Sequence, residues 1–167
     1  MTTTKQANER TAEPQPVTPD LFREALSRWT TGVAVLAVRG EQGVKGMTVS
    51  SFCSVSLEPP LVSVVLNNES NSMKVLQERK HYVINLLAHD QESIARHFAG
   101  RPQFDHDPFP ESGPPMLEGS LASIECDLWA NYPGGDHTIV VGEIRSIRLG
   151  QEKEPLAYAL RGYHRLK

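Results

Sequence analysis

Short, largely apolar segments rich in β-branched residues run along most of this chain, and they constrain its fold more than any other feature. They occupy residues 32–39, 44–57, 60–67, 81–88, 120–132 and 137–149. Such segments are typical of strands, and most are joined by turns rather than by a regular alternation with helices. The pattern predicts a mainly β protein whose antiparallel sheet closes into a barrel, and it disfavours a Rossmann sheet.

Short helices are predicted between these strands. Residues 18–29 combine a capping Thr18 and an early Pro19 with apolar residues on one face. This arrangement predicts an amphipathic helix packed on another element. Residues 70–79 and 90–99 indicate two further short helices.

Composition limits the kinds of protein that this chain can be. Its 167 residues, 39% of them hydrophobic, suit one globular domain. We expect that domain at residues 18–167, because residues 1–17 are polar and aperiodic, as in a disordered tail. A net charge of −3 gives no basic footprint for nucleic acid. Two distant cysteines and the lack of a signal-like or membrane-spanning apolar run favour a reduced, cytoplasmic protein without membrane contact.

Several catalytic motifs are missing. No G-x-G-x-x-G follows a predicted strand, and no phosphate-binding P-loop, G-x-S-x-G elbow or H-E-x-x-H pair occurs. The polar cluster "FDHDPF" around His106 is interpreted as an acidic, solvated loop, so no metal site is expected.

The stretch "GMTVSSFCSVSLEPP", residues 46–60, carries an unusual number of hydroxyl groups for a strand. Because successive side chains on a strand point to opposite faces, most of the hydroxyls fall on one face. The alternation breaks at Ser51 and Phe52, which predicts a bulge or strand junction there. The hydroxyl face could be solvent-exposed, or it could hold a polar ligand.

Two further motifs could contribute to a site. In "PGGDHT", Asp136 and His137 stand where a strand begins, positioned either for ordinary turn chemistry or for orienting a ligand. In "PLAYALRGYHR", Arg161 and Tyr163 offer a cation and an aromatic ring near the C-terminus.

Taken in order, these segments resemble the short-chain flavin reductase family, the reductase partners of two-component flavin-dependent monooxygenases. The resemblance rests on "WTTGVAVLAV", "GMTVSSFCSVSLEPPLVSVVLN", "YVINLLAHDQESIARHFAG", "GDHTIVVGEI" and "PLAYALRGYHRL". It implies an antiparallel Greek-key split β-barrel of the FMN-binding type, usually a homodimer. The implied activity is hydride transfer from NADH or NADPH to FMN or FAD, with reduced flavin supplied to a partner monooxygenase.

Carried over by position, the resemblance implies a flavin-binding site made mainly of hydroxyl and main-chain NH groups. The isoalloxazine edge would lie along Thr48, Val49, Ser50 and Ser51, and the ribityl and phosphate groups near Ser54, Val55 and Ser56. The other implied flavin contacts are Thr31, Gly32, Val33, Met47, Ser70, Ser72, Phe98, Ala99, Gly100, Arg101, Phe104, Asp136 and Tyr163.

His137 matches the residue that faces the nicotinamide. Hydride transfer needs no strong acid or base, so His137 is interpreted as a positioning residue. Two alternatives keep the same barrel: a non-catalytic flavin- or heme-binding module, and an oxidase of a phosphorylated amine. The latter is disfavoured because only Lys45 and Lys74 offer positive charge near the hydroxyl stretch.

Overall fold

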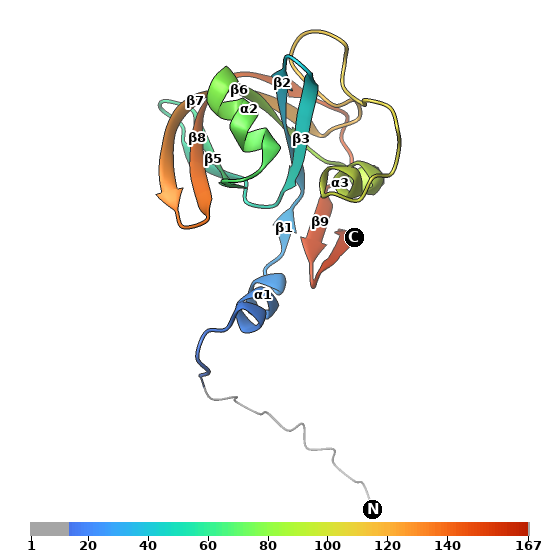
Figure 1. The fold of residues 1–167 in the computed structure, drawn as a ribbon. Coiled ribbons are helices and arrows are strands. Elements are labelled where there is room, and N and C mark those ends of the chain that lie inside the picture. Colours follow the sequence, from blue (N-terminus) through green and yellow to red (C-terminus); the bar gives the residue numbers. More distant parts are fainter. Residues whose placement is uncertain (1–13, 167) are drawn as a thin grey trace, which may run out of the picture.

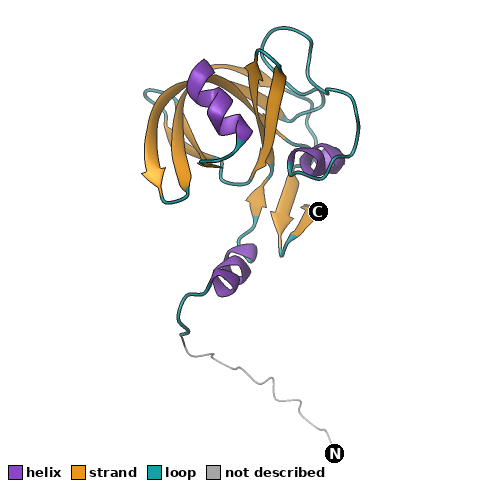
Figure 2. Ribbon diagram, viewed as in Figure 1, coloured by secondary structure: helices purple, strands orange, loops and turns teal. Residues whose placement is uncertain are grey.

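The computed structural model describes residues 14–166. Most of the predicted tail, residues 1–13, lies outside the described residues, and residues 14–18 form neither helix nor strand. The chain is mainly β, as predicted, with all of its paired strands antiparallel within the described part. Figure 2 shows strands forming most of the body, with short helices on its outside.

The larger sheet has seven strands in the order β3-β2-β6-β7-β8-β5-β4. The bounds of these strands are β2 (Ala34–Gly40), β3 (Gly43–Val49), β4 (Cys53–Ser56), β5 (Leu61–Asn67), β6 (His81–Leu86), β7 (Ala122–Gly134) and β8 (His137–Leu149). A smaller sheet pairs β1 (Thr31–Gly32), β9 (Leu156–Ala159) and β10 (Gly162–Arg165) in the order β1-β9-β10.

The large sheet is not closed, so the expectation of a closed barrel was wrong. Strands β3 and β4 follow one another in the chain but lie at opposite ends of the sheet order. Residues Ser50–Phe52 separate them, at the break that the sequence pattern predicted. No strand ladder joins β3 to β4 within residues 14–166, because the backbone leaves strand geometry at this break.

Three α-helices lie outside the sheets: α1 (Pro19–Ser27), α2 (Asn71–Arg79) and α3 (Glu92–Phe98), the last preceded by the 3₁₀ turn His89–Gln91. The cap predicted at Thr18 forms, since its hydroxyl accepts from the N–H of Leu21, and the Ser70 hydroxyl caps α2 by accepting from the N–H of Met73. A cap expected at Asp90 does not form, because Asp90 lies inside the 3₁₀ turn and α3 begins after Gln91. Figure 1 shows α2 lying across the large sheet and α3 beside β3 and β9, whereas α1 projects away from the body.

The core has two parts, one on each face of β2. On one face, Leu36 and Val38 pack with Leu76 of α2 and with side chains of β5 to β8. On the other face, Val35 and Ala37 pack with Ala95 of α3 and with residues of the loop that follows it. Strand β2 is therefore continuously apolar because both of its faces are buried.

The apolar face of α1 is left uncovered by the other residues that the structure describes. None of its residues is buried, and Phe22, Leu26 and the following Trp29 are each more than half exposed. The predicted helix is therefore present, but the predicted packing on another element is absent among the described residues.

Candidate functional site

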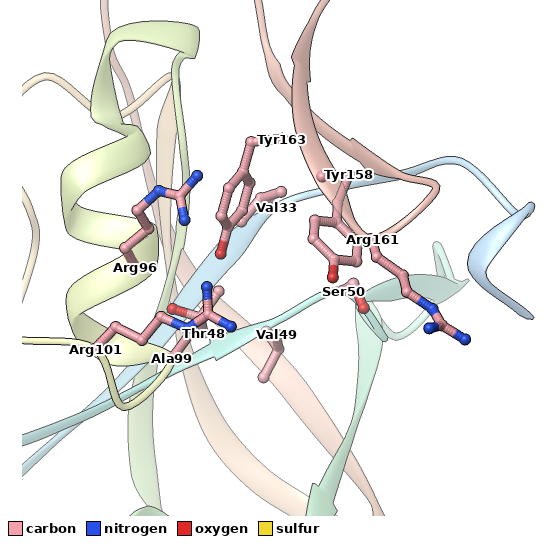
Figure 3. A pocket seen from close by; sticks show the side chains of 11 residues that line it. Val33, Thr48, Val49, Ser50, Arg96, Ala99, Arg101, Tyr158, Arg161 and Tyr163 are labelled. Atoms are coloured by element: carbon pink, nitrogen blue, oxygen red, sulfur yellow. The ribbon is translucent and has the colours of Figure 1, made fainter. Parts of the chain in front are cut away.

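A cavity of about 270 Å³ opens where β3, α3 and the β9–β10 hairpin meet. Two adjoining hollows share Ser50 with it, one toward β1 and one toward α1. Figure 3 shows its labelled side chains converging from these elements. The residues lining the cavity are Val33, Thr48, Val49, Ser50, Arg96, Ala99, Arg101, Tyr158, Arg161, Gly162 and Tyr163.

Strand β3 brings hydroxyl and main-chain groups to this cavity. It pairs with β2 on one side only, so its other edge keeps unpaired N–H and C=O groups among the described strands. The Thr48 hydroxyl donates to the carbonyl of Ala95 at 2.7 Å, which fixes α3 against the strand. Ser50 extends past the end of the strand and lines the cavity. Hydroxyl and backbone groups at this position can bind the polar edge of a ring without net charge.

Ser51 has a structural task that the sequence pattern did not reveal. Its hydroxyl donates to the carbonyl of Val65 at 3.1 Å and accepts from the N–H of the same residue at 3.0 Å. At the break between β3 and β4, the Ser51 side chain thus makes the two hydrogen bonds to Val65 of β5 that a neighbouring strand would otherwise make. The Ser51 hydroxyl lines the hollow toward β1, but its hydrogen bonds go to the sheet.

The end of α3 turns the chain back toward the cavity. Gly100 takes a positive φ of 81°, the N–H of Gly100 donates to the carbonyl of His97, and that of Arg101 to the carbonyl of Arg96. These bonds form a Schellman motif, which reverses the chain direction at a helix C-terminus. The reversal brings Ala99 and Arg101 to the cavity wall.

Strands β9 and β10 supply two tyrosines. Tyr158 and Tyr163 are directly opposite in register, with ring centroids 5.2 Å apart, and the guanidinium of Arg96 lies 5.2 Å from the Tyr163 ring. In Figure 3 both phenol oxygens point toward β3, near Thr48 and Ser50. Burial, and then the neighbouring Tyr158, raise the pKa of Tyr163, so it is a neutral hydrogen-bond donor at neutral pH.

The cavity is positively charged. Three arginines line it and no Asp or Glu does. Arg96 is paired with Glu92 at 2.5 Å. Arg101 and Arg161 form no side-chain hydrogen bond or ion pair with any part of the chain that the structure describes.

His137 lies at another place, at the tip of the β7–β8 hairpin. Its Nδ1 is 2.7 Å from Asp136, and this hydrogen bond lowers the pKa of the Asp136 carboxyl. It is paired in register with Asn67, and the N–H of Asn68 donates to the carbonyl of Asp136. The hairpin tip therefore adjoins the start of α2, where Ser70 is the N-cap.

The structure gathers only part of the sequence-predicted site in the cavity. It brings together Val33, Thr48, Val49, Ser50, Ala99, Arg101 and Tyr163. Thr31 and Gly32 line the hollow toward β1, and the buried Thr31 hydroxyl has no hydrogen-bond partner in the described part of the chain. Asp136, His137 and Ser70 lie around the hairpin tip, with Ser72 buried in the first turn of α2.

The other predicted residues line none of these hollows. Met47 and Phe98 pack against the core, which their apolar side chains favour. The edge strand β4 holds Ser54, Val55 and Ser56. Gly100 shapes the end of α3, and Phe104 stacks on His97 with centroids 3.9 Å apart. Arg96 and Tyr158 are cavity residues that the sequence did not predict, and Arg161 had no predicted role. The i, i+4 spacing of Glu92 and Arg96 is a signal for an ion pair on one helix face and not for a place in the cavity.

Neither a membrane-spanning helix nor a metal-binding group is found among residues 14–166. No helix there is long and apolar enough to cross a membrane. No three His, Cys, Asp or Glu side chains there come together as a metal site would require. Cys53 and Cys126 are free thiols.

Comparison with known proteins defines the family. The model of the flavin reductase like domain matches residues 26–167. The chain is 43% identical over 147 residues to the reductase component of 4-hydroxyphenylacetate 3-monooxygenase from Thermus thermophilus, covering 88% of this chain and 96% of that protein. It is 38% identical over 139 residues to an NADH-dependent flavin reductase of a Rhodococcus species, covering 78% and 77%. The solved structure of the flavin reductase PheA2 superposes with a TM-score of 0.85 at 34% identity, covering 90% and 99%. The chain belongs to the flavin reductase-like domain family.

Proposed function

We propose that this protein is an NADH- or NADPH-dependent flavin reductase that transfers a hydride to FMN or FAD and supplies reduced flavin to a partner monooxygenase. The observation that carries this proposal is the similarity, over most of both chains, to an NADH-dependent flavin reductase and to the reductase component of a monooxygenase. The cavity suits such a ligand, since it combines a free strand edge, neutral hydroxyls and unpaired cations.

The bound flavin would accept the hydride from the reduced nicotinamide. The chain itself would hold and orient the two reactants, which is the main requirement for hydride transfer. The free edge of β3 would donate main-chain N–H groups to the polar edge of the ring, next to Thr48 and Ser50. The neutral phenol of Tyr163 would donate a further hydrogen bond, and Arg101 would favour negative charge nearby.

We infer that His137 positions the nicotinamide rather than transferring a proton. The Asp136 carboxylate accepts a hydrogen bond from Nδ1 of His137. This bond fixes the imidazole ring and leaves its Nε2 free for a ligand. The variant His137→Ala is expected to raise the KM for NADH more than the Kd for flavin. His106→Ala, a substitution of an exposed histidine that lines none of the hollows, is the matched control.

We further infer a homodimer, a split barrel and a cytoplasmic location. The exposed apolar face of α1 is a surface that a second copy of this chain would cover. The lack of pairing between β3 and β4, at the two ends of the described sheet, supports a split barrel. We take residues 18–167 as the single domain that forms it. The free thiols of Cys53 and Cys126 suit a reducing compartment.

The test is a steady-state assay of NADH and NADPH oxidation with FMN, FAD and riboflavin in turn. Oxidation of a nicotinamide nucleotide that depends on added flavin is the expected result. Tight flavin or heme binding without any oxidation would instead support the non-catalytic binding module, and the reductase proposal would then be wrong.

A further inference from the structure

Arg161 occupies an unfavourable backbone conformation at the rim of the cavity. It forms, with Leu160, the two-residue loop between β9 and β10, since Ala159 and Gly162 on either side are paired. Both loop residues have positive φ, 49° for Leu160 and 63° for Arg161. This is a type I′ turn, in which Asn-Gly is the favoured sequence because most residues that carry a Cβ atom are strained at positive φ.

Packing of the turn does not explain why these residues are present. The Leu160 side chain is 69% exposed. Within residues 14–166, the loop backbone makes one hydrogen bond outside the hairpin, from the N–H of Leu160 to the carbonyl of Ser27 at the end of α1. A main-chain bond of this kind would form equally well with Asn at position 160, so it does not require Leu or Arg.

The position of the Arg161 side chain does offer an explanation. It lines both the cavity and the hollow toward α1, at their shared boundary. Figure 3 shows Arg101 at one end of the cavity and Arg161 at the other, with the tyrosine and serine hydroxyls between them. Both guanidinium groups lack a partner in the described chain, whereas Arg96 is neutralised by Glu92.

We propose that Arg161 is a phosphate-binding residue that selects phosphorylated nucleotides over their dephosphorylated forms, and that the strained turn serves to place it there. The proposal rests on the proposed function, because it assumes that the cavity receives a flavin or a nicotinamide nucleotide. Guanidinium groups bind phosphate in a planar, two-pronged geometry, and a cavity without carboxylates favours a dianionic group. Two sources share this chemistry: the phosphate of the flavin and the diphosphate of the nicotinamide nucleotide.

The experiment measures binding and turnover of Arg161→Gln with phosphorylated and unphosphorylated ligands. If the flavin supplies the phosphate, the Kd for FMN rises roughly tenfold, as expected for loss of one charge-assisted hydrogen bond, and the Kd for riboflavin changes less than about twofold. If the nicotinamide nucleotide supplies it, the KM for NADH rises while that for reduced nicotinamide riboside stays constant. Equal effects on both members of each pair, or no effect in either, would overturn the proposal.

Two further variants separate ligand binding from a structural role. Arg165→Gln removes the same charge from the same hairpin, at a residue paired with Glu154. It should leave unchanged the ratio of the Kd for FMN to that for riboflavin and the ratio of the KM for NADH to that for reduced nicotinamide riboside. Arg161→Gly relieves the backbone strain at positive φ, so it should raise Tm. It should also weaken the binding of FMN or NADH as much as Arg161→Gln does. A fall in both Tm and affinity would show that Arg161 acts only through the fold. Flavin binding is followed by fluorescence quenching, so the proposal can be tested even if the protein oxidises no NADH.

Discussion

The contact between Gly46 of β3 and Phe98 at the end of α3 gives a sharp test of how the cavity is built. A Cβ atom at position 46 would lie 2.5 Å from Cδ1 and 2.6 Å from Cε1 of the Phe98 ring. Ordinary carbon–carbon contact begins about 1 Å farther out. The ring cannot easily turn away, because it packs against Phe109 and His97 at centroid distances of 5.4 and 4.9 Å. Gly46→Ala must therefore push the end of α3 away from β3.

The expected cost follows from overpacking of a well-filled interior. Such insertions typically destabilise by about 1–3 kcal/mol, which corresponds in a domain of this size to a fall in Tm of roughly 2–12 °C. The same displacement would carry Ala99 and Arg101 outward, since both lie within three residues of Phe98. Misplacement of about 1 Å can reduce kcat/KM by up to roughly 100-fold, so flavin reduction should fall more than stability alone explains.

The assay combines thermal unfolding, followed by circular dichroism, with flavin reduction at a temperature where every variant is folded. Adding Phe98→Leu to Gly46→Ala should restore Tm and activity, giving a coupling energy of about 0.5–3 kcal/mol between the two positions. Gly134→Ala is the control, because a Cβ there meets only ordinary contacts of 3.4 Å or more. A Gly46→Ala variant that melts within about 1 °C of the parent would refute the packing argument.

Three other predictions concern groups away from the cavity. A hydrogen bond from His81 lowers the pKa of the Asp127 carboxyl, so the ionised carboxylate stabilises the fold above about pH 4 and this stabilisation is lost as the pH falls further. Asp127→Asn should therefore flatten the acid side of a plot of the free energy of unfolding against pH. Burial raises the pKa of Cys126 to about 12, so iodoacetamide at pH 8 should label only the exposed Cys53 in the native protein and both thiols after denaturation, as mass spectrometry would show. Among residues 14–166 the buried Tyr82 hydroxyl has no partner stronger than the weakly accepting Cys126 thiol. Tyr82→Phe should therefore leave the free energy of unfolding unchanged or raise it by up to about 1 kcal/mol in urea titration, and a clear loss would contradict this.

Local features of the fold were readable from the sequence. The cap at Thr18, the short helix that begins after Ser70, and the break at Ser51–Phe52 all form as predicted. Each depends on residues close together in the chain. The open sheet was not predicted, because the separation of β3 from β4 depends on pairings between distant strands.

The candidate site was readable only in part for a similar reason. Alternation along the strand marks Thr48 and Ser50 as facing one way, and both line the cavity. It cannot tell where the strand leaves the cavity, and β4 carries Ser54 away along the sheet edge. Arg96 and Tyr158 reach the cavity only because α3 and the β9–β10 hairpin meet there, and the local pattern around each residue does not indicate that meeting.

The connection Ser50–Phe52 has a consequence for the size of ligand that this protein can accept. Because it joins the two ends of the sheet, those ends can separate by at most about 14 Å, the length of the extended chain between Val49 and Cys53. This three-residue connection limits the distance between the end of β3 and the start of β4, and no side-chain substitution can increase that limit. A bulkier ligand would therefore need room at the outer wall of the cavity, formed by the end of α3 and the β9–β10 turn.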